Sequence, residues 1–367
     1  MYYPAQTLVL GATVIRKERA FPPGASGKAQ VRQGAPVQPD TVVLSGSQPG
    51  DFVILDALAA LGINDPSLIS QDVLQVRPGE RIQDGQPIFS LGSGRREKVM
   101  SSPIPAVFIR LDGTNVILRR DPVDVEVRAL LPGSISSVKG ETSVTVETIG
   151  AFVQGGWGNG KEAYATLTLE PEGGIESLAG GDDMVQRVQG TAIILTKPIT
   201  SLSVFTIAQN RELAALVAPS MPSALREIAL RQPFPVLLTE GFGDHPMSEI
   251  VYNVLRGNAN RPAGIDARTS GRWSLARPDI TVPLSTTAKP PAPEINQPVV
   301  VGATVRLTRA PHAGHSGRVY RLPTSPRPLE NGLLALGAEV QLTSGEVVFV
   351  PLANLELLGR PLEAGRS

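Results

Sequence analysis

Two ten-residue stretches, 31–40 and 76–85, repeat one pattern along the first half of the chain. Both begin with Val-Arg and have Gly at the fourth and Gln at the eighth position, and Val37 of the first matches Ile82 of the second. A glycine at that position suits a turn with positive φ, and the runs 41–44 and 86–89 that follow are typical of short strands. The first half of the chain is therefore expected to consist of short strands joined by glycine turns.

Two further segments predict β-hairpins. Residues 105–113 and 132–140 each begin with a proline-led turn, continue as an alternating strand, and reach a glycine turn that leads into a second strand. Alternation with a period of two indicates half-buried antiparallel strands. Between the two repeated stretches, residues 52–62 read as a short helix that ends at Gly62.

Residues 28–150 resemble the biotinyl/lipoyl barrel-sandwich hybrid fold. The resemblance rests on 76–89 and 102–111, which are similar to the glycine-spaced strand and the Ser-Pro-led strand of that family. Its carrier members attach biotin or lipoate to a lysine at a hairpin tip, and Lys98 lies in the corresponding interval without the Met-Lys-Met or acidic-Lys-Ala pattern of the carriers. The resemblance therefore implies a spacer or docking module with no cofactor. Residues 1–180 are predicted to form a β-rich domain of this kind with an internal repeat.

A change of period near residue 185 predicts a small α/β domain over 181–284. In chain order the predicted elements are strands at 191–195, 213–218 and 235–238, helices at 202–209, 223–230 and 246–256, and an edge strand at 264–267. The first strand is a continuous apolar run, as expected for burial on both faces, whereas the alanines of the second would also suit a helix. Strands and helices that alternate at this spacing predict a parallel sheet.

Ligands of such sheets bind where the carboxyl ends of strands meet helix N-termini. The predicted strand ends give a candidate ligand-binding set of Lys197, Ser220, Glu240, Gly241, Gly243, Asp244 and His245. The glycines permit a tight turn, and Asp244 is expected to cap a helix that starts at Pro246. Carboxylate, imidazole and backbone N–H groups in one turn suit a polar or anionic ligand, but the same residues also suit a plain strand-to-helix connector. No catalytic residue and no metal site is predicted, because neither a nucleophile with an oriented base nor a full set of metal ligands is found.

A Pro-rich stretch at 285–298 predicts an extended linker. Beyond it, five short strands with glycine turns predict an SH3-like barrel over 299–360. Residues 305–319 resemble the KOW motif of transcription elongation factors and ribosomal proteins, which consists of a strand, a glycine-containing turn and a second strand. The resemblance implies docking on RNA, the ribosome, RNA polymerase or another protein.

Six side chains of this last module are the candidate docking residues for a partner or nucleic acid: Arg306, Arg309, His312, His315, Arg318 and Arg321. Residues 299–360 contain six arginines, no lysine and four glutamates. This small excess of positive charge favours a protein or ribonucleoprotein partner and leaves weak RNA binding as the second choice. The two histidines alone are too few for a metal site.

Composition narrows the class of protein. The chain has 34 basic and 34 acidic side chains, which argues against bulk binding to nucleic acid or an anionic membrane, and no cysteine, which excludes disulfides and thiol catalysis. No signal peptide or membrane helix is evident, so a cytoplasmic location is predicted. We therefore expect a multidomain β and α/β protein that acts as a non-enzymatic adaptor or binding protein, docking on transcription or translation machinery through its KOW-like module. The alternatives are a small-ligand-binding or enzymatic α/β domain with its site at 240–245, and a carrier modified on Lys98.

Overall fold

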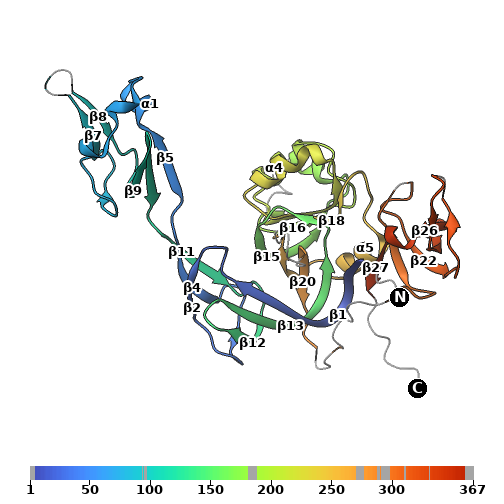
Figure 1. Ribbon diagram of the computed structural model, residues 1–367. Helices are drawn as coiled ribbons and strands as arrows, with labels where there is room; N and C mark the ends of the chain where they lie inside the picture. Colours follow the sequence, from blue (N-terminus) through green and yellow to red (C-terminus); the bar gives the residue numbers. More distant parts are fainter. Residues whose placement is uncertain are drawn as a thin grey trace.

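In the computed structural model the chain forms a row of β-rich parts rather than one rounded body (Figure 1). The structure describes residues 5–92, 94, 97–180, 188–269, 277–286, 290, 298–309, 311–329 and 331–359. The fold is mostly β, with a large mixed sheet of 16 strands, and this agrees with the predicted β and α/β class. Most of the predicted linker at 285–298, and residues 181–187 at the start of the predicted α/β domain, lie outside the described residues.

Two long strands connect the parts. β1 (Ala5–Ala20) pairs in parallel with β27 (Leu355–Gly359) through its first residues. The rest of β1 pairs antiparallel with β13 (Ser143–Gln154), with a register shift between Leu10 and Thr13. At a rise of about 3.3 Å per residue, the 16 residues of β1 extend over roughly 50 Å. One strand therefore belongs both to the C-terminal part of the molecule and to its centre.

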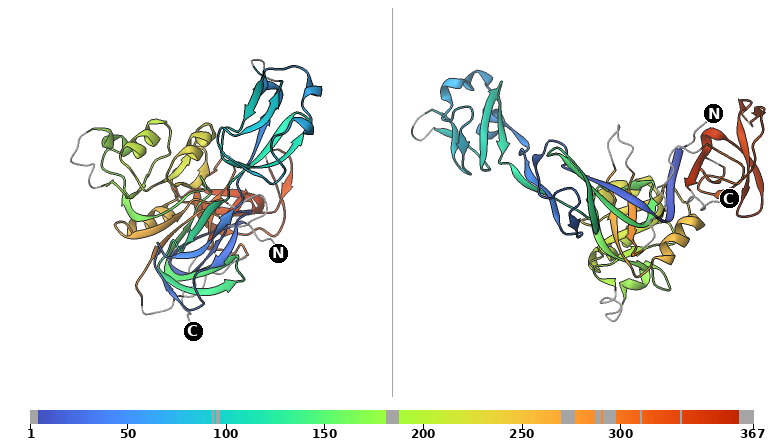
Figure 2. Two further views of the ribbon diagram at one scale, coloured as in Figure 1. Left: turned by 90° about the vertical axis from the view of Figure 1, so that its left-hand side faces the viewer. Right: turned by 90° about the horizontal axis from the view of Figure 1, so that it is seen from below.

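Residues 50–122, the distal module, project away from the rest of the molecule (Figure 2). Its elements are β5 (Phe52–Asp56), α1 (Ala57–Leu61), β6 (Arg81–Ile82), β7 (Pro87–Leu91), β8 (Lys98–Ser101), β9 (Ala106–Asp112) and β10 (Asn115–Arg120), with short 3-10 turns at Pro66–Leu68 and Gln71–Val73. The sheet order is β5-β10-β9-β6, and β7 pairs with β8 as a separate hairpin. Buried Ile88, Phe89 and Phe108 belong to a core that lies wholly within this module.

The helix predicted at 52–62 is wrong over its first half. Residues 52–56 are strand β5, which pairs antiparallel with β10, and only 57–61 are helical. Asp56 is the reason for the change, because its carboxylate accepts hydrogen bonds from the Leu58 and Ala59 N–H groups and so starts the helix there. The predicted end is confirmed, since Gly62 is the C-cap with φ of 59°.

The stretches 31–40 and 76–85 make matching backbone contacts. Gly34 and Gly79 have φ of 82° and 86°, as predicted for glycine turns. The Gly34 N–H donates to Ile135 O at 2.7 Å, and the Gly79 N–H donates to Phe108 O at 2.8 Å. Each stretch thus contains a short strand that pairs with a neighbouring hairpin, β3 (Pro36–Val37) with β12 (Gly133–Lys139) and β6 with β9.

An intermediate β module lies between the distal module and the centre (Figure 1). It contains β2 (Ser26–Ala29), β3, β4 (Val42–Gln48), β11 (Val123–Arg128) and β12 (Gly133–Lys139). β4 lies between β11 and β2, while β12 pairs with β13. The predicted hairpins at 105–113 and 132–140 are confirmed as β9–β10 and β12–β13.

The centre of the molecule combines parallel and antiparallel strands. Its elements are β13, β14 (Trp157–Gly158), β15 (Glu162–Leu169), a 3-10 turn at Ile175–Ala179, β16 (Ala192–Ile194), α3 (Ser203–Asn210), β17 (Ala215–Met221), a 3-10 turn at Ser223–Leu225, α4 (Arg226–Arg231), β18 (Val236–Phe242), α5 (Glu249–Gly257), β19 (Pro262–Asp266) and β20 (Asp279–Pro283). β15, β16, β17 and β18 run parallel, so the predicted parallel sheet and its three strands are confirmed. The predicted edge strand is wrong as an edge, because β19 lies between β15 and β20 and pairs antiparallel with both.

Residues 299–359, the C-terminal module, contain the five predicted strands. They are β21 (Thr304–Leu307), β22 (Ser316–Arg321), β25 (Gly337–Leu342), β26 (Val347–Pro351) and β27, with the short pair β23 (Arg327–Pro328) and β24 (Leu334–Ala335), and a 3-10 turn at Leu352–Asn354 before β27. The order β27-β21-β22-β25-β26 is antiparallel throughout, and β1 adds in parallel to β27. None of the helices in the described ranges is long and apolar enough to cross a membrane.

Candidate functional site

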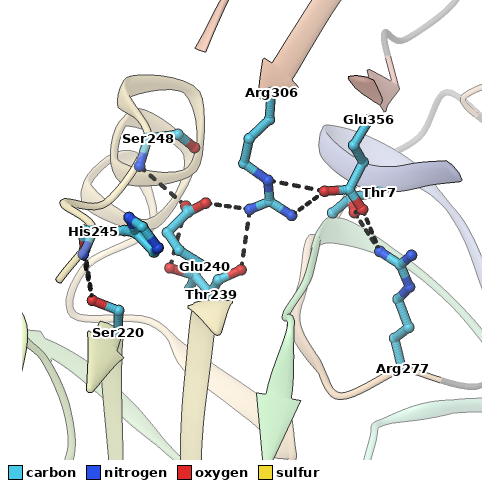
Figure 3. A network of polar contacts seen from close by, with 9 residues as sticks. All are labelled: Thr7, Ser220, Thr239, Glu240, His245, Ser248, Arg277, Arg306 and Glu356. Atoms are coloured by element: carbon cyan, nitrogen blue, oxygen red, sulfur yellow. Dashed lines mark hydrogen bonds and ion pairs between the residues drawn. The ribbon is translucent and has the colours of Figure 1, made fainter. Parts of the chain in front are cut away.

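Two residues from different predicted sets, Arg306 and Glu240, meet in a buried ion pair (Figure 3). Glu240 follows the apolar run of β18 at the carboxyl end of the parallel strands, and Arg306 comes from β21 of the C-terminal module. The Arg306 guanidinium also donates to Thr239 O at 3.3 Å and, through Nε, to Glu356 Oε2 at 2.9 Å. The side chains of Arg306, Glu240 and Glu356 are 8%, 0% and 6% exposed, so the network is shielded from water.

Glu356 extends this network to the first residues of β1. Thr7, which is fully buried, donates its hydroxyl to Glu356 Oε1. Arg277 Nη1 donates to the same carboxylate oxygen at 2.6 Å and to Thr7 Oγ1 at 2.5 Å. Five segments that are distant in the sequence are therefore held together by one set of polar contacts, as Figure 3 shows.

The contacts of the network stabilise the charged forms of Arg306 and Glu356. Burial opposes ionisation of Arg306, but Glu240 and Glu356 outweigh burial and raise the pKa of Arg306 above its ordinary value. Burial likewise opposes ionisation of Glu356, but Arg306, the Thr7 hydroxyl and Arg277 lower the pKa of Glu356 below its ordinary value. Charges that are buried together in this way hold their segments in a fixed geometry, because separating them leaves an unpaired charge in the interior.

Ser220 and His245 lie beside this network. The Ser220 hydroxyl and the His245 backbone form hydrogen bonds with each other. The Ser220 hydroxyl donates to His245 O at 2.8 Å and accepts from the His245 N–H at 2.9 Å. The His245 ring packs between two glycines with positive φ. A Cβ at Gly243 would lie 2.4 Å from its Nε2, and one at Gly314 of the C-terminal module would lie 2.8 Å from its Nδ1. The ring thus fills the joint between the sheet and the C-terminal module.

The predicted helix start at Pro246, with Asp244 as its cap, is wrong. Helix α5 begins at Glu249 with Ser248 as the N-cap, and Asp244 is exposed. The physical reason is Glu240, whose Oε1 accepts the Ser248 N–H at 3.1 Å and so places a carboxylate at the start of the helix. The residues between Gly243 and Ser248 therefore form an irregular connection that contains His245.

The other predicted site residues are spread out. Gly241 is buried with φ of 91°, next to Ser220 across β17 and β18, whereas Lys197 is exposed. In the C-terminal module, His312 is half-buried, and the remaining docking residues Arg309, His315, Arg318 and Arg321 are exposed. Lys98 donates through Nζ to Leu61 O and Gly62 O, both at 2.9 Å, so its ammonium closes the C-terminal end of α1.

A second charged cluster lines a cleft of about 1220 Å³ along β1. Lys17 Nζ is shared by Asp266, at 2.7 Å, and Asp279, and each of these side chains is less than one-eighth exposed. Burial raises the pKa of Asp279 above its ordinary value, against the opposing effect of Lys17. For Asp266, burial is outweighed by Arg268 and Lys17, which lower its pKa. The pKa values of the two aspartates, which lie opposite each other on β19 and β20, are therefore shifted in opposite directions.

Sequence reasoning missed Thr7, Lys17, Asp266, Arg277, Asp279 and Glu356. Several of these stand next to apolar or β-branched residues, as in Gly264-Ile265-Asp266 and Asp279-Ile280-Thr281, where a charge that the fold buries needs a partner. That signal marks a residue as paired, but it does not say with which distant segment. Within the part of the chain that the structure describes, no group of three or more His, Asp or Glu side chains is arranged to hold a metal ion.

A comparison of the sequence with models of known protein families and with curated proteins found no match.

Proposed function

We propose that this protein is a non-catalytic adaptor that binds a partner protein through one exposed sheet face of its C-terminal module. Arg318 on β22 is opposite Gln341 on β25, and Gln341 is opposite Val347 on β26. All three are exposed, and Tyr320, two residues beyond Arg318, is 61% exposed. We name Arg318, Tyr320, Gln341 and Val347 the β22 face.

The composition of the β22 face supports protein binding. Tyrosine and arginine are the residue types that contribute most often to binding energy at interfaces, and Val347 adds an apolar contact. The face is not strongly basic, since Glu339 in the neighbouring row pairs with Arg327 at 2.7 Å. Binding energy on this face would therefore come from the tyrosine ring and the arginine guanidinium rather than from contacts with the phosphates of a nucleic acid.

The buried network adds a second support for this proposal. Arg306 was predicted as a docking residue, but its guanidinium is enclosed and paired with Glu240 and Glu356. Its contribution to docking is therefore indirect, since it fixes the module that carries the β22 face. A surface held in place before binding loses little freedom when the partner binds.

We infer that the C-terminal module is an SH3-like barrel of the KOW type and that residues 28–150 are a barrel-sandwich hybrid spacer, which carries no cofactor. A KOW-type module implies a partner in the transcription or translation machinery, in the cytoplasm. The extended arrangement in Figure 1 suits a spacer that keeps two bound bodies apart.

The test is affinity purification from the native host with purified full-length protein as bait. Arg318→Ser with Tyr320→Ser should remove a specific partner that wild type retains, because both changes lie on the exposed face. The matched control is Phe52→Ser with Arg256→Ser, since Phe52 is 63% exposed on the distal module and Arg256 is exposed at the end of α5. Equal recovery of all partners by the two double variants would contradict the proposal, and a ribosome or RNA polymerase among the lost partners would support the KOW assignment.

A further inference from the structure

A pocket of about 490 Å³ lies next to the buried network, between the carboxyl ends of the parallel strands and the C-terminal module. Thr196, just after β16, and Ser248 and Tyr252 of α5 form one side. His315, Ser316 and Thr343 of the C-terminal module form the other. The volume is in the range of small-molecule sites, and the carboxyl edge of parallel strands is the usual place for one.

Ser248, one of the residues that line the pocket, carries an unsatisfied polar group. Ser248 is 4% exposed, and among the described residues its Oγ has no hydrogen-bond partner. A serine at the N-cap normally accepts a hydrogen bond from its own helix, but this one does not. In Figure 3 the contact with Glu240 starts at the backbone nitrogen of Ser248, and no contact starts at its Oγ. A buried hydroxyl without a partner costs stability, so a ligand hydroxyl that pairs with it would be favoured.

The surroundings of Ser248 select against an anionic ligand. The start of α5, which would otherwise attract an anion, already faces the carboxylate of Glu240. Glu249, in the first turn of α5, is the carboxylate that lines the pocket itself. An anion would be repelled by the Glu249 carboxylate, whereas a neutral ligand would not.

The remaining lining groups fit a neutral ligand with several hydroxyls. Ser316, Thr343 and Tyr252 bring hydroxyl groups from both sides, and Glu249 brings an acceptor for ligand O–H groups. His315 Nδ1 lies 3.2 Å from His312 O, which leaves Nε2 as the ring nitrogen for a ligand. The Tyr252 ring offers a flat apolar surface of the kind that the C–H face of a sugar covers.

We propose that this pocket binds a neutral polyhydroxylated compound, a monosaccharide or disaccharide, with Ser248 Oγ bonded to one of its hydroxyls. The proposal is independent of partner binding on the β22 face. It also differs from the anionic site expected at 240–245, because Glu240 and Ser220 are satisfied by protein groups and the ligand contacts fall on α5 and the C-terminal module instead.

Saturation-transfer NMR followed by calorimetric titration of the full-length protein tests this. The probes are glucose, galactose, mannose, N-acetylglucosamine and their common disaccharides, with inorganic phosphate and glucose 6-phosphate as anionic comparisons. We expect at least one neutral sugar to bind and both anions to bind at least tenfold more weakly. Ser248→Ala should weaken the sugar about tenfold, the effect of losing one hydrogen bond from a buried group. Ser344→Ala, exposed beside Thr343, should leave affinity unchanged.

The experiment distinguishes a ligand-binding role of Ser248 from a purely structural one. Without ligand, Ser248→Ala should melt at the same temperature as wild type or above it, because it removes an unpaired buried hydroxyl. Failure of every neutral sugar to bind, stronger binding of phosphate, or equal sugar affinity in Ser248→Ala and wild type would each overturn the proposal.

Discussion

Arg306 on β21 and Glu240 at the end of β18 form an ion pair between the C-terminal module and the parallel strands, and neither side chain is more than 8% exposed. Through Glu356 the same guanidinium is linked to Thr7 and Arg277, so the pair is the centre of a joint that also includes β1. The joint explains how a module at the far end of the chain is held against the sheet.

Arg306→Met should lower the free energy of unfolding by about 3–5 kcal/mol, because it leaves the two glutamates buried without their shared partner. Arg318→Met removes an arginine of the neighbouring strand β22 that is exposed, and it should cost less than about 0.5 kcal/mol. Urea denaturation of both variants gives the comparison. If both variants lost a similar amount of unfolding free energy, the buried ion pairs of Arg306 would contribute nothing to stability, and this account of the joint would be contradicted.

Gly314→Ala should destabilise the joint more than Gly345→Ala does. Both glycines belong to the C-terminal module and have positive φ, 82° and 90°, so both substitutions carry a similar backbone cost. Only at Gly314 would the new Cβ contact the His245 ring, whereas nothing lies within 4 Å at Gly345. We expect an additional loss of about 1–3 kcal/mol at Gly314, the usual effect of overpacking. Combining Gly314→Ala with His245→Ala should recover part of it, and strict additivity of the two changes would contradict this explanation.

Glu356→Gln should be much less stable than wild type at neutral pH, and the difference should shrink in acid. The pKa of Glu356 is lower in the folded than in the unfolded protein, so its stabilising effect is present above its ordinary pKa and is lost as the pH falls through the folded value. Thermal melts of both proteins between about pH 3 and pH 7 measure this. A difference that does not change with pH would mean that the charge of Glu356 contributes nothing.

Asp279→Asn should show the opposite trend. Burial raises the pKa of Asp279, so its contribution is favourable below its ordinary pKa of 3.8 and is lost as the pH rises through the folded value. An asparagine does not ionise and so loses no stability as the pH rises. The variant should therefore gain stability relative to wild type between about pH 3 and pH 7. Melting curves over that range decide the point, and a relative stability that falls as the pH rises would contradict it.

The fold could be predicted from the sequence wherever local signals decide the structure. The glycine turns at Gly34 and Gly79, the strand of 191–195 and the helix end at Gly62 all follow from residue types at fixed offsets. The start of α5 could not be predicted in the same way, because the group that faces it is Glu240, eight residues earlier, and not the nearer Asp244. Nothing local in the sequence says which carboxylate will be turned toward the helix.

The candidate site was predicted in pieces but not as a whole. Glu240 and Arg306 were both singled out, in different roles, and their pairing depends on a contact between segments 66 residues apart. The strand β1 was not predicted, although its apolar run 8–10 and the Val14–Ile15 pair could have indicated one. Its partner β27 lies at the other end of the described chain, and pairing at that separation leaves no local signal.

The central claim, that the C-terminal module presents the β22 face to a partner protein, is tested most directly by site-specific photo-crosslinking in native cells. A benzoylphenylalanine at position 320 should give one discrete crosslinked partner, because Tyr320 is exposed on the face, and the same group at position 52 of the distal module should not give that product. No crosslinked protein at position 320, or the same product from both positions, would contradict the account.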